Sequence, residues 1–358
     1  MNHAVDLAGP MTLPGVRRRL TGGEVAGLVG LGVIALMPIP FGSFGFFVGQ
    51  FALIYAILGL SVVVVTGYAG LVSLMTYSFA GIGAMVTGIA MASWGWPFWM
   101  ALPLAALATV PVSIVVGVTS VRLKGLYLAI ATLTFADALG ETFFKFSKAT
   151  HGLSGWVVHR PHLVRSDASF YVLLFVVAML LVWMVTGLRS SRIGRAMLAV
   201  RANEREAQAL GINVYKTKLI AFLISGMLGG VGGAFLALLL KQVTRSAFQS
   251  PLVEATSILL VTVVVVGGID RALGAFLGAV ALVVQQQVFQ GAQFFFAYFG
   301  IYSAGLLIVF LLYRPGGLMQ VARLQWRMIR ARPKVGITVT VAIIAINVGV
   351  AWLFVRAG

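Results

Sequence analysis

Cysteine is absent from all 358 residues, and acidic side chains are scarce, with nine Asp and Glu against 26 Lys and Arg. Without cysteine the chain forms no disulfide bonds, uses no thiol chemistry and holds no cysteine-ligated zinc. The P-loop pattern G-x-x-x-x-G-K-[ST] is also missing. If ATP drives a process in which this chain takes part, another chain must hydrolyse it.

An enzyme is not indicated either, because the sequence offers no constellation of nucleophiles or metal ligands. His151, His159 and His162 lie close together in one polar stretch. Loop histidines are usually solvated, and no carboxylate follows them at ligand spacing, so we predict neither a metal site nor a cofactor bound by this chain.

Hydrophobic residues make up 60% of the chain and charged residues only 10%, with a mean hydropathy of +1.01. Soluble domains are nearer half apolar and about a quarter charged. The long apolar runs predict an all-α integral membrane protein, a polytopic helix bundle of about ten or eleven spans with short cytoplasmic coupling helices. The expected spans are 24–40, 46–66, 70–91, 98–119, 125–146, 168–187, 217–240, 253–267, 272–291, 298–313 and 336–355. The run 253–267 fits either a short tilted helix or half of a broken one.

The net charge of +17 would suggest nucleic acid as the partner of a soluble protein. In a membrane protein, cytoplasmic loops collect lysine and arginine, which is the simpler explanation here. Most basic residues fall on one side when the N-terminus is placed in the cytoplasm and the spans alternate. This predicts a multi-pass protein of the bacterial inner membrane, in contact with lipid and not with nucleic acid, with its C-terminus in the periplasm.

The segment from Ser190 to Lys216 is unusually polar for this chain. Ser190 or Ser191 is a good N-cap, and Ile193, Met197 and Val200 then share one helix face. The segment is too polar to span a membrane, so it should lie at the inner surface.

A second short helix is predicted directly after it. Asn203 is a good N-cap, Glu206 stands three residues on as in a capping box, and Gly211 is a natural stop. We expect a two-turn helix over Glu204–Leu210 with Ala207 and Leu210 facing inward. The segment either binds lipid headgroups through its arginines or docks a cytoplasmic partner; two capped helices favour docking.

Acidic residues within predicted spans are costly and therefore informative. Asp137 and Glu141 are one turn apart on one face, with Lys145 one turn further. A Glu141–Lys145 pair would be a structural anchor, whereas an inward face of the span would line a wet pathway. For Asp137 we favour the pathway or a hydrogen bond between helices. Glu254 is interpreted as a favourable charge at a helix N-terminus.

Polar uncharged residues interrupt other spans. Gln286 lies in a run of three glutamines, at least one of which should face another helix. Ser73, Thr76 and Ser78 allow the same two interpretations, a bond between helices or a place in the pathway.

Glycines recur at spacings that let helices pack closely, either within one subunit or against a second one. The predicted packing glycines are Gly81, Gly83, Gly229, Gly230 and Gly233.

Several blocks in order resemble one known family. "TGYAGLVSLMTYSFAGIGAM", "GLYLAIATLTFAD", "IGRAMLAVRANEREAQALGINVYKTKLIAFLISGMLGGVGGAFLA" and "VVGGIDRALGAFLGA" are similar to the ABC importer permeases for branched-chain amino acids and related small solutes. Met75 and Thr76 stand where that family usually shows Gly and His. The resemblance covers roughly residues 45–320.

The resemblance implies a function and its partners. The chain would be a permease subunit that works by alternating access with a homologous permease subunit, two ABC ATPase subunits that bind ATP and Mg²⁺, and an extracytoplasmic solute-binding protein. The implied ATPase-coupling residues are Asn203, Glu204, Glu206, Ala207 and Gly211. The hypothetical pathway residues are Ser73, Thr76, Asp137, Glu141 and Gln286.

This organisation divides the chain into a cytoplasmic tail (1–23), a permease domain (24–320) with a coupling loop (188–217), and a basic linker with an extra C-terminal helix (321–358). The alternative function is a secondary transporter or channel that needs no ATPase. Such a protein would also have buried acids and broken helices, but it would leave the capped surface helices unexplained.

Overall fold

The computed structural model describes residues 42–120, 123, 125–145, 154–248, 252–269, 271–279 and 283. Helices dominate these residues, and two short strands pair with each other. The longer helices are α2 (Gly42–Val62), α3 (Thr76–Gly88), α4 (Phe98–Ala108), α5 (Val110–Ser120), α6 (Leu126–Glu141), α8 (Asp167–Ser190), α9 (Arg192–Ala202), α10 (Glu204–Ala209), α11 (Val214–Leu240) and α12 (Leu252–Gly267). The short elements are the π-helical η2 (Val63–Tyr68) and η3 (Ile89–Ser93), the 3₁₀ turns η4 (Phe143–Lys145), η5 (His162–Val164) and η6 (Arg245–Phe248), and the strands β1 (Trp156–Val157) and β2 (Gln242–Val243).

Membrane-spanning length and hydropathy are met by 4 helical segments among the described residues, or by 5 if one bent pair counts as a span. The segments are Gly42–Tyr68, Phe98–Thr119, Asp167–Ser190 and Val214–Leu240, and the bent pair is Val253–Gly267 with Ala272–Ala279. These match predicted spans and confirm a polytopic helical protein. The predicted total of ten or eleven is not confirmed: α3 and α6, which fall in the predicted spans 70–91 and 125–146, are not among these segments, and 24–40, 298–313, 336–355 and most of 272–291 lie outside the described residues.

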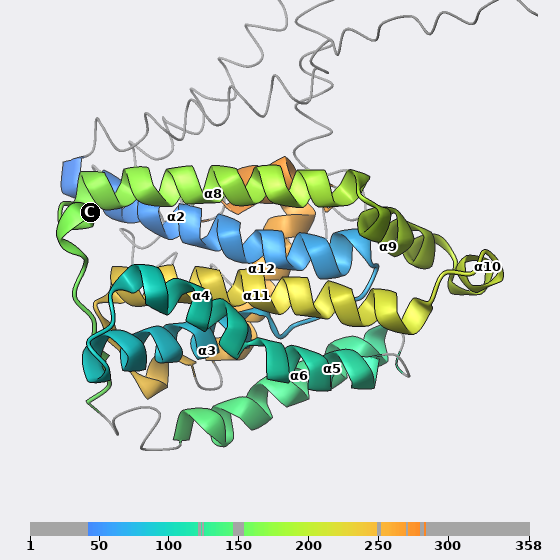
Figure 1. Cartoon of the computed structure of the whole chain (residues 1–358), viewed down its shortest axis with the longest axis horizontal. Helices are drawn as coiled ribbons and strands as arrows, with labels where there is room; N and C mark the ends of the chain where they lie inside the picture. The colour runs from blue at the N-terminus through green and yellow to red at the C-terminus, as the bar shows by residue number, and fades with distance from the viewer. Residues whose placement is uncertain are drawn as a thin grey trace, which may run out of the picture.

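Helix α11 occupies the middle of the bundle and packs against α2, α3, α4 and α5 (Figure 1). Helix α8 lies along α2, while α12 packs against α2, α3 and α6. Outward-facing side chains of α8, such as Val176, Leu180 and Trp183, are exposed. An exposed apolar face of this kind suits a helix that contacts lipid.

Four of the five predicted packing glycines, Gly83, Gly229, Gly230 and Gly233, lie where helices approach closely. A Cβ atom on Gly233 of α11 would stand 2.7 Å from the carbonyl carbon of Ala80 in α3, and one on Gly83 would stand 2.7 Å from Gly230 Cα. Gly229 faces the Cβ of Phe79 at 2.7 Å. The close α3–α11 contact therefore depends on glycine, and it lies within one subunit.

Gly81 lies on a different face of α3. A Cβ atom there would meet the ring of Phe144 at 2.6 Å and that of Phe248 at 2.9 Å. The rings of these two phenylalanines lie 5.8 Å apart and are both fully buried. Gly81 thus makes room for aromatic packing from η4 and η6 rather than for another helix backbone.

The helix predicted over 70–91 begins later than expected. The chain is not helical between Ala69 and Met75, and α3 starts at Thr76. Gly70 has φ +71, a conformation that glycine adopts without strain. The hydroxyl of Ser73 accepts a hydrogen bond from Met75 N at 3.4 Å. Apolar periodicity alone did not reveal this break.

A second break follows α12. The pair Val253–Gly267 and Ala272–Ala279 bends by 117°, and Gly268 has φ +116. Of the two alternatives left open by the sequence, the structure therefore shows half of a bent pair rather than a straight short helix. Non-helical backbone at membrane depth is tolerated where protein buries it or where it lines a cavity.

The segments that connect the long helices lie at two opposite ends of the bundle. Helices α9 and α10 project from one end (Figure 1). At the other, β1 pairs antiparallel with β2, with Trp156 opposite Val243, and η3 packs against β1. Trp94 and Trp96, directly after η3, are exposed there. This division agrees with the alternation of sides predicted from the basic residues.

Candidate coupling surface and translocation pathway

Helix α9 starts at a serine cap, as predicted. Ser191 is extended (φ −71, ψ 169), and its hydroxyl accepts a hydrogen bond from Gly194 N at 3.1 Å. Met197 and Val200 are buried. Ile193, which shares their face by spacing, is 42% exposed. It lies in the first turn of α9, close to the cap.

Helix α10 is capped by Asn203. The Asn203 Oδ1 atom accepts hydrogen bonds from Arg205 N at 3.0 Å and Glu206 N at 3.5 Å, and Asn203 Nδ2 donates to Glu206 Oε1 at 2.7 Å. Gly211 follows with φ +79. The predicted cap and stop are therefore confirmed.

One face of α10 packs against the protein, and the other face is exposed to solvent. Ala207 is buried in a small apolar cluster with Val200 and Val214. Leu210, which was expected to face inward, is 78% exposed. The helix ends at Ala209, so Leu210 occupies the C-cap and turns away from the cluster. Leu210 is therefore accessible to a partner protein or to lipid.

Glu204 faces inward, unlike its neighbour Glu206. Its Oε1 atom lies 2.9 Å from the Nζ of Lys218 on α11. Lys218 has no solvent exposure. No local pattern joins two residues that lie on different helices, so sequence reasoning missed this ion pair.

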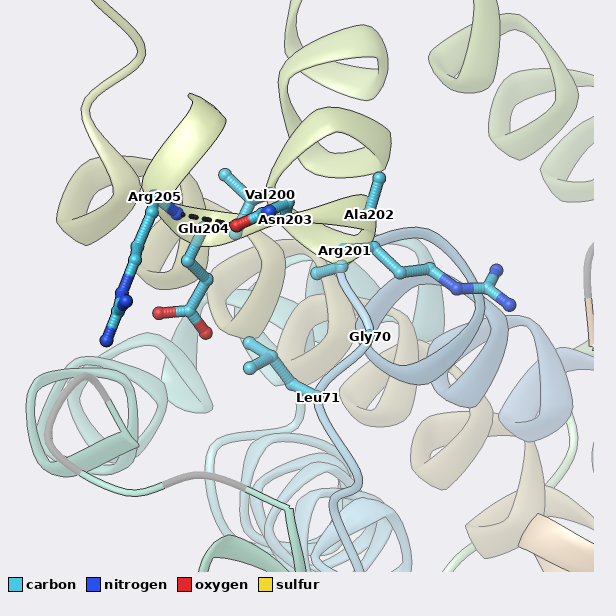
Figure 2. A pocket seen from close by; sticks show the side chains of 9 residues that line it. Gly70, Leu71, Val200, Arg201, Ala202, Asn203, Glu204 and Arg205 are labelled. Atoms are coloured by element: carbon cyan, nitrogen blue, oxygen red, sulfur yellow. Dashed lines mark hydrogen bonds between the residues drawn. The ribbon is translucent and has the colours of Figure 1, made fainter. Parts of the chain in front are cut away.

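A pocket of about 230 Å³ separates α9 and α10 from the break before α3 (Figure 2). It is lined by Ala69–Leu71 on one side and by Val200–Arg205 on the other. Figure 2 shows Glu204 and Arg205 pointing to the same side, while Arg201 extends the other way. Arg201 Nη1 donates to the carbonyl oxygen of Gly67 in η2.

Two helix breaks meet beside this pocket. A Cβ atom on Gly67 would collide with the carbonyl oxygen of Ile269, which lies in the bend after α12. One on Gly70 would stand 2.7 Å from Arg201 Cγ. The glycines therefore let the α9 side chain and the second break approach the first. The arrangement connects the projecting helices to both irregular segments of the bundle.

Five buried side-chain atoms of the described residues have no hydrogen-bond partner; one is Lys218 Nζ on α11, which lies at ion-pair distance from Glu204, and the other four are on three helices that pack on one another. Among the described residues these atoms include Thr76 Oγ1 and Ser78 Oγ on α3, Asp137 Oδ1 on α6 and Ser257 Oγ on α12. Helices α3, α6 and α12 are in mutual contact. Buried polar groups are normally satisfied, so such a group of exceptions points to a functional surface.

An acidic pair belongs to the same region. The Asp137 carboxyl interacts with that of Glu254 on α12, and Glu141 is its next acidic neighbour. Asp137 is only partly buried and Glu141 is exposed. Glu254 was interpreted only as a helix N-terminal charge, and its contact with Asp137 was not predicted. Two carboxyls in contact disfavour the ionised form of both at once, and a cation bound beside them would relieve that repulsion.

The remaining predicted pathway residues behave differently. Ser73 is buried, but its hydroxyl is used by Met75 N. Gln286 lies outside the described residues.

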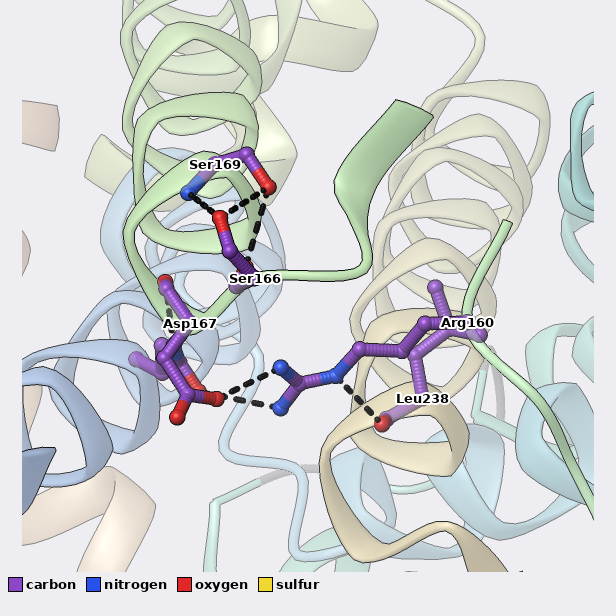
Figure 3. Close-up of polar contacts among 6 residues, drawn as sticks. Arg160, Ser166, Asp167, Ser169 and Leu238 are labelled. Carbon is purple, nitrogen blue, oxygen red and sulfur yellow. Dashed lines mark hydrogen bonds and ion pairs between the residues drawn. The ribbon is translucent and has the colours of Figure 1, made fainter. Parts of the chain in front are cut away.

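The opposite end of the bundle is fastened by Arg160 (Figure 3). Its Nη1 donates to Asp167 Oδ1 at 2.6 Å, its Nη2 to Gln50 Oε1 at 3.4 Å, and its Nε to the carbonyl of Leu238 at 3.4 Å. The guanidinium lies 4.3 Å from the ring centre of Phe170. One side chain thus joins α2, α8 and α11. Within the described ranges no group of three potential metal ligands lies together, and His151 falls outside them.

Residues 46–311 match the family model described as the permease component of the branched-chain amino acid transport system. The chain belongs to this permease family. It is a permease subunit of an ABC importer and a multi-pass membrane protein, and the family is one of transporters rather than enzymes.

Curated relatives of the permease agree with this assignment. The chain is 30% identical over 311 residues to the high-affinity branched-chain amino acid permease protein LivM of Salmonella typhimurium, covering 78% of this chain and 71% of the relative. It is 29% identical to LivM of Escherichia coli with the same coverage. A nucleoside permease protein, NupC of Lactococcus lactis, is 44% identical over 64 residues, 18% of this chain and 20% of that one. No solved structure matches the chain.

Proposed function

We propose that this permease moves branched-chain amino acids, or closely related small polar solutes, by alternating access. It pairs with a homologous permease subunit, receives its solute from an extracytoplasmic binding protein, and is driven by two ABC ATPase subunits docked on α9 and α10. ATP and Mg²⁺ are bound by those ATPases, and this chain needs no cofactor of its own. The residues 188–217 form the coupling loop of the permease domain 24–320.

The observation that carries the proposal is the connection between the projecting helices and the helix breaks. Leu210 and Glu206 of α10 are exposed and available to a partner. Arg201, at the end of α9, bonds the carbonyl of Gly67, where the chain leaves the helix before α3. A displacement of α9 and α10 therefore acts directly on an irregular segment, which absorbs movement more easily than a continuous helix.

The chemistry of the α3–α6–α12 surface fits an amino acid. The carboxyls of Asp137 and Glu254 suit the solute's ammonium group, and the unpaired hydroxyls of Thr76 and Ser257 offer further hydrogen bonds. In broken-helix transporters, helix termini and unwound backbone serve the same purpose for charged solute groups. We assign the pathway to this surface, with Glu141 at its exposed edge.

We place the α9–α10 end in the cytoplasm and the β1–β2 end outside. The basic residues Arg192, Arg195, Arg201 and Arg205 are gathered at the first end, as the positive-inside rule requires. Exposed Trp94 and Trp96 mark the other membrane boundary. The binding protein would then dock near β1–β2.

Reconstitution tests this function. The permease pair, the ATPases and the binding protein are placed in proteoliposomes containing ATP and supplied with radiolabelled L-leucine outside. Uptake should require both ATP and the binding protein. Leucine uptake by the two permease chains alone would refute the proposed mechanism, and ATP-dependent uptake of a nucleoside but not of leucine would refute the proposed solute.

A further inference from the structure

Lys218 is a fully buried lysine near the start of α11. Its ammonium nitrogen lies 2.9 Å from Glu204 Oε1 on α10, and the Glu204 side chain is 28% exposed. A lysine is almost never fully buried unless it is paired, because its charge must leave water. The position of Lys218 therefore depends on Glu204.

Helix α10 is held at its start by the Asn203 cap and on one face by Ala207. It contains six residues, and Ala207 is its only buried one. A short turn, in which Gly211 has φ +79, leads from it to Asn213, the N-cap of α11. The cap fixes where the helix starts, and Ala207 fixes which face is buried. A charged pair with a short distance sets the orientation more narrowly, since the buried ammonium tolerates few other arrangements.

Helix α11 is in contact with several other helices, so a displacement of α11 would affect each of them. It packs on α2, α3, α4 and α5, and its glycines bring its backbone against that of α3. Close-packed interiors transmit strain rather than absorb it. A displacement at Lys218 is thus passed to α3, the helix that carries the unpaired hydroxyls of Thr76 and Ser78.

We propose that the Lys218–Glu204 ion pair is the link through which movement of α10 reaches α11. Lys218 is then a positioning residue for coupling, and Glu204 serves this internal link rather than direct contact with the ATPase. The inference rests on the proposed function, because it takes α10 as the element that the ATPases move. It also separates the two glutamates of the loop: Glu206 accepts a hydrogen bond from the Asn203 cap, and Glu204 pairs with Lys218.

Charge substitutions in the complete transporter test the link. Lys218→Met, Glu204→Gln and the exchanged pair Glu204→Lys/Lys218→Glu are compared with Lys216→Met, which changes an exposed lysine two positions away in the same way. For each, leucine uptake per ATP hydrolysed and co-purification of the ATPases are measured in proteoliposomes. We expect Lys218→Met to lower uptake per ATP by about tenfold or more, within the usual range of coupling between sites, while the ATPases still co-purify. The exchanged pair should recover more uptake than either single variant.

The opposite results are equally clear. Wild-type uptake per ATP in Lys218→Met would overturn the link, as would loss of ATPase binding in Glu204→Gln. If Lys218→Met does not assemble, Lys218→Met/Glu204→Met removes both charges: an assembled but uncoupled transporter supports the proposal, whereas an assembled and coupled one, or a second failure to assemble, overturns it. Failure of the wild-type complex to take up leucine would instead count against the proposed function.

Discussion

Gly233 provides the sharpest test of how the bundle is packed. In Gly233→Ala the new methyl carbon would collide with the carbonyl oxygen of Ala80, its nearest neighbour, and would stand 2.7 Å from the carbonyl carbon, well inside the 3.4 Å at which ordinary contact begins. The neighbouring atoms are backbone, so the clash can be relieved only by separating α3 from α11. Overpacking of this kind costs about 1–3 kcal/mol.

A control glycine isolates that cost. Gly187 lies in α8, where an added Cβ would meet nothing within 4 Å. Alanine is favoured over glycine in a helix by up to about 1 kcal/mol, so Gly187→Ala should be neutral or slightly stabilising. Gly233→Ala gains the same propensity but adds the clash, which leaves it up to about 2 kcal/mol less stable than wild type.

Unfolding in mixed micelles measures the difference. Sodium dodecyl sulfate is titrated against the purified permease, and fluorescence of its seven tryptophans reports unfolding. The Gly233→Ala transition should move to lower detergent fraction and the Gly187→Ala transition should not. Equal stability of the two variants would show that α3 and α11 do not touch as described.

Three further substitutions test the site. Gly211→Val forces a β-branched residue into φ +79, at a cost of about 1–2 kcal/mol, and should reduce ATP-driven uptake without reducing membrane insertion; unchanged uptake would contradict the role of this turn. Asp137→Asn should lower leucine uptake more than it lowers assembly with the ATPases, and an equal loss of both would indicate a structural role. Since the chain has no cysteine, Ser257→Cys can be tested with a membrane-impermeant thiol reagent: it should react at a rate that changes on ATP binding, whereas Ala178→Cys, buried in α8, should stay unreactive.

Local features of the chain were the most accessible from sequence. The caps at Ser191 and Asn203 and the stop at Gly211 depend on side chains within three residues of the backbone groups they serve. The long apolar runs likewise predicted the helices α2, α8 and α11. Leu210 was placed on the wrong face because an ideal helix was extended one residue beyond its real end.

Contacts between residues far apart in the sequence could not be predicted in this way. Glu254 and Asp137 lie on helices that meet only through the tertiary fold, and Lys218 carries no mark in the sequence of being buried. The break before Thr76 was also missed, because residues 70–75 are nearly as apolar as a helix would be. Hydropathy reports burial in the membrane or protein but not backbone conformation.

The central claim is that α10 docks on an ATPase rather than on lipid, and a photo-crosslinking amino acid at Leu210 tests it most directly. The complete transporter is irradiated in proteoliposomes, and the adducts of this chain are separated and identified by mass spectrometry. The account requires an adduct with the ATPase subunit, whose yield changes when ATP is added. Adducts with phospholipid alone, in a transporter that still takes up leucine, would contradict it.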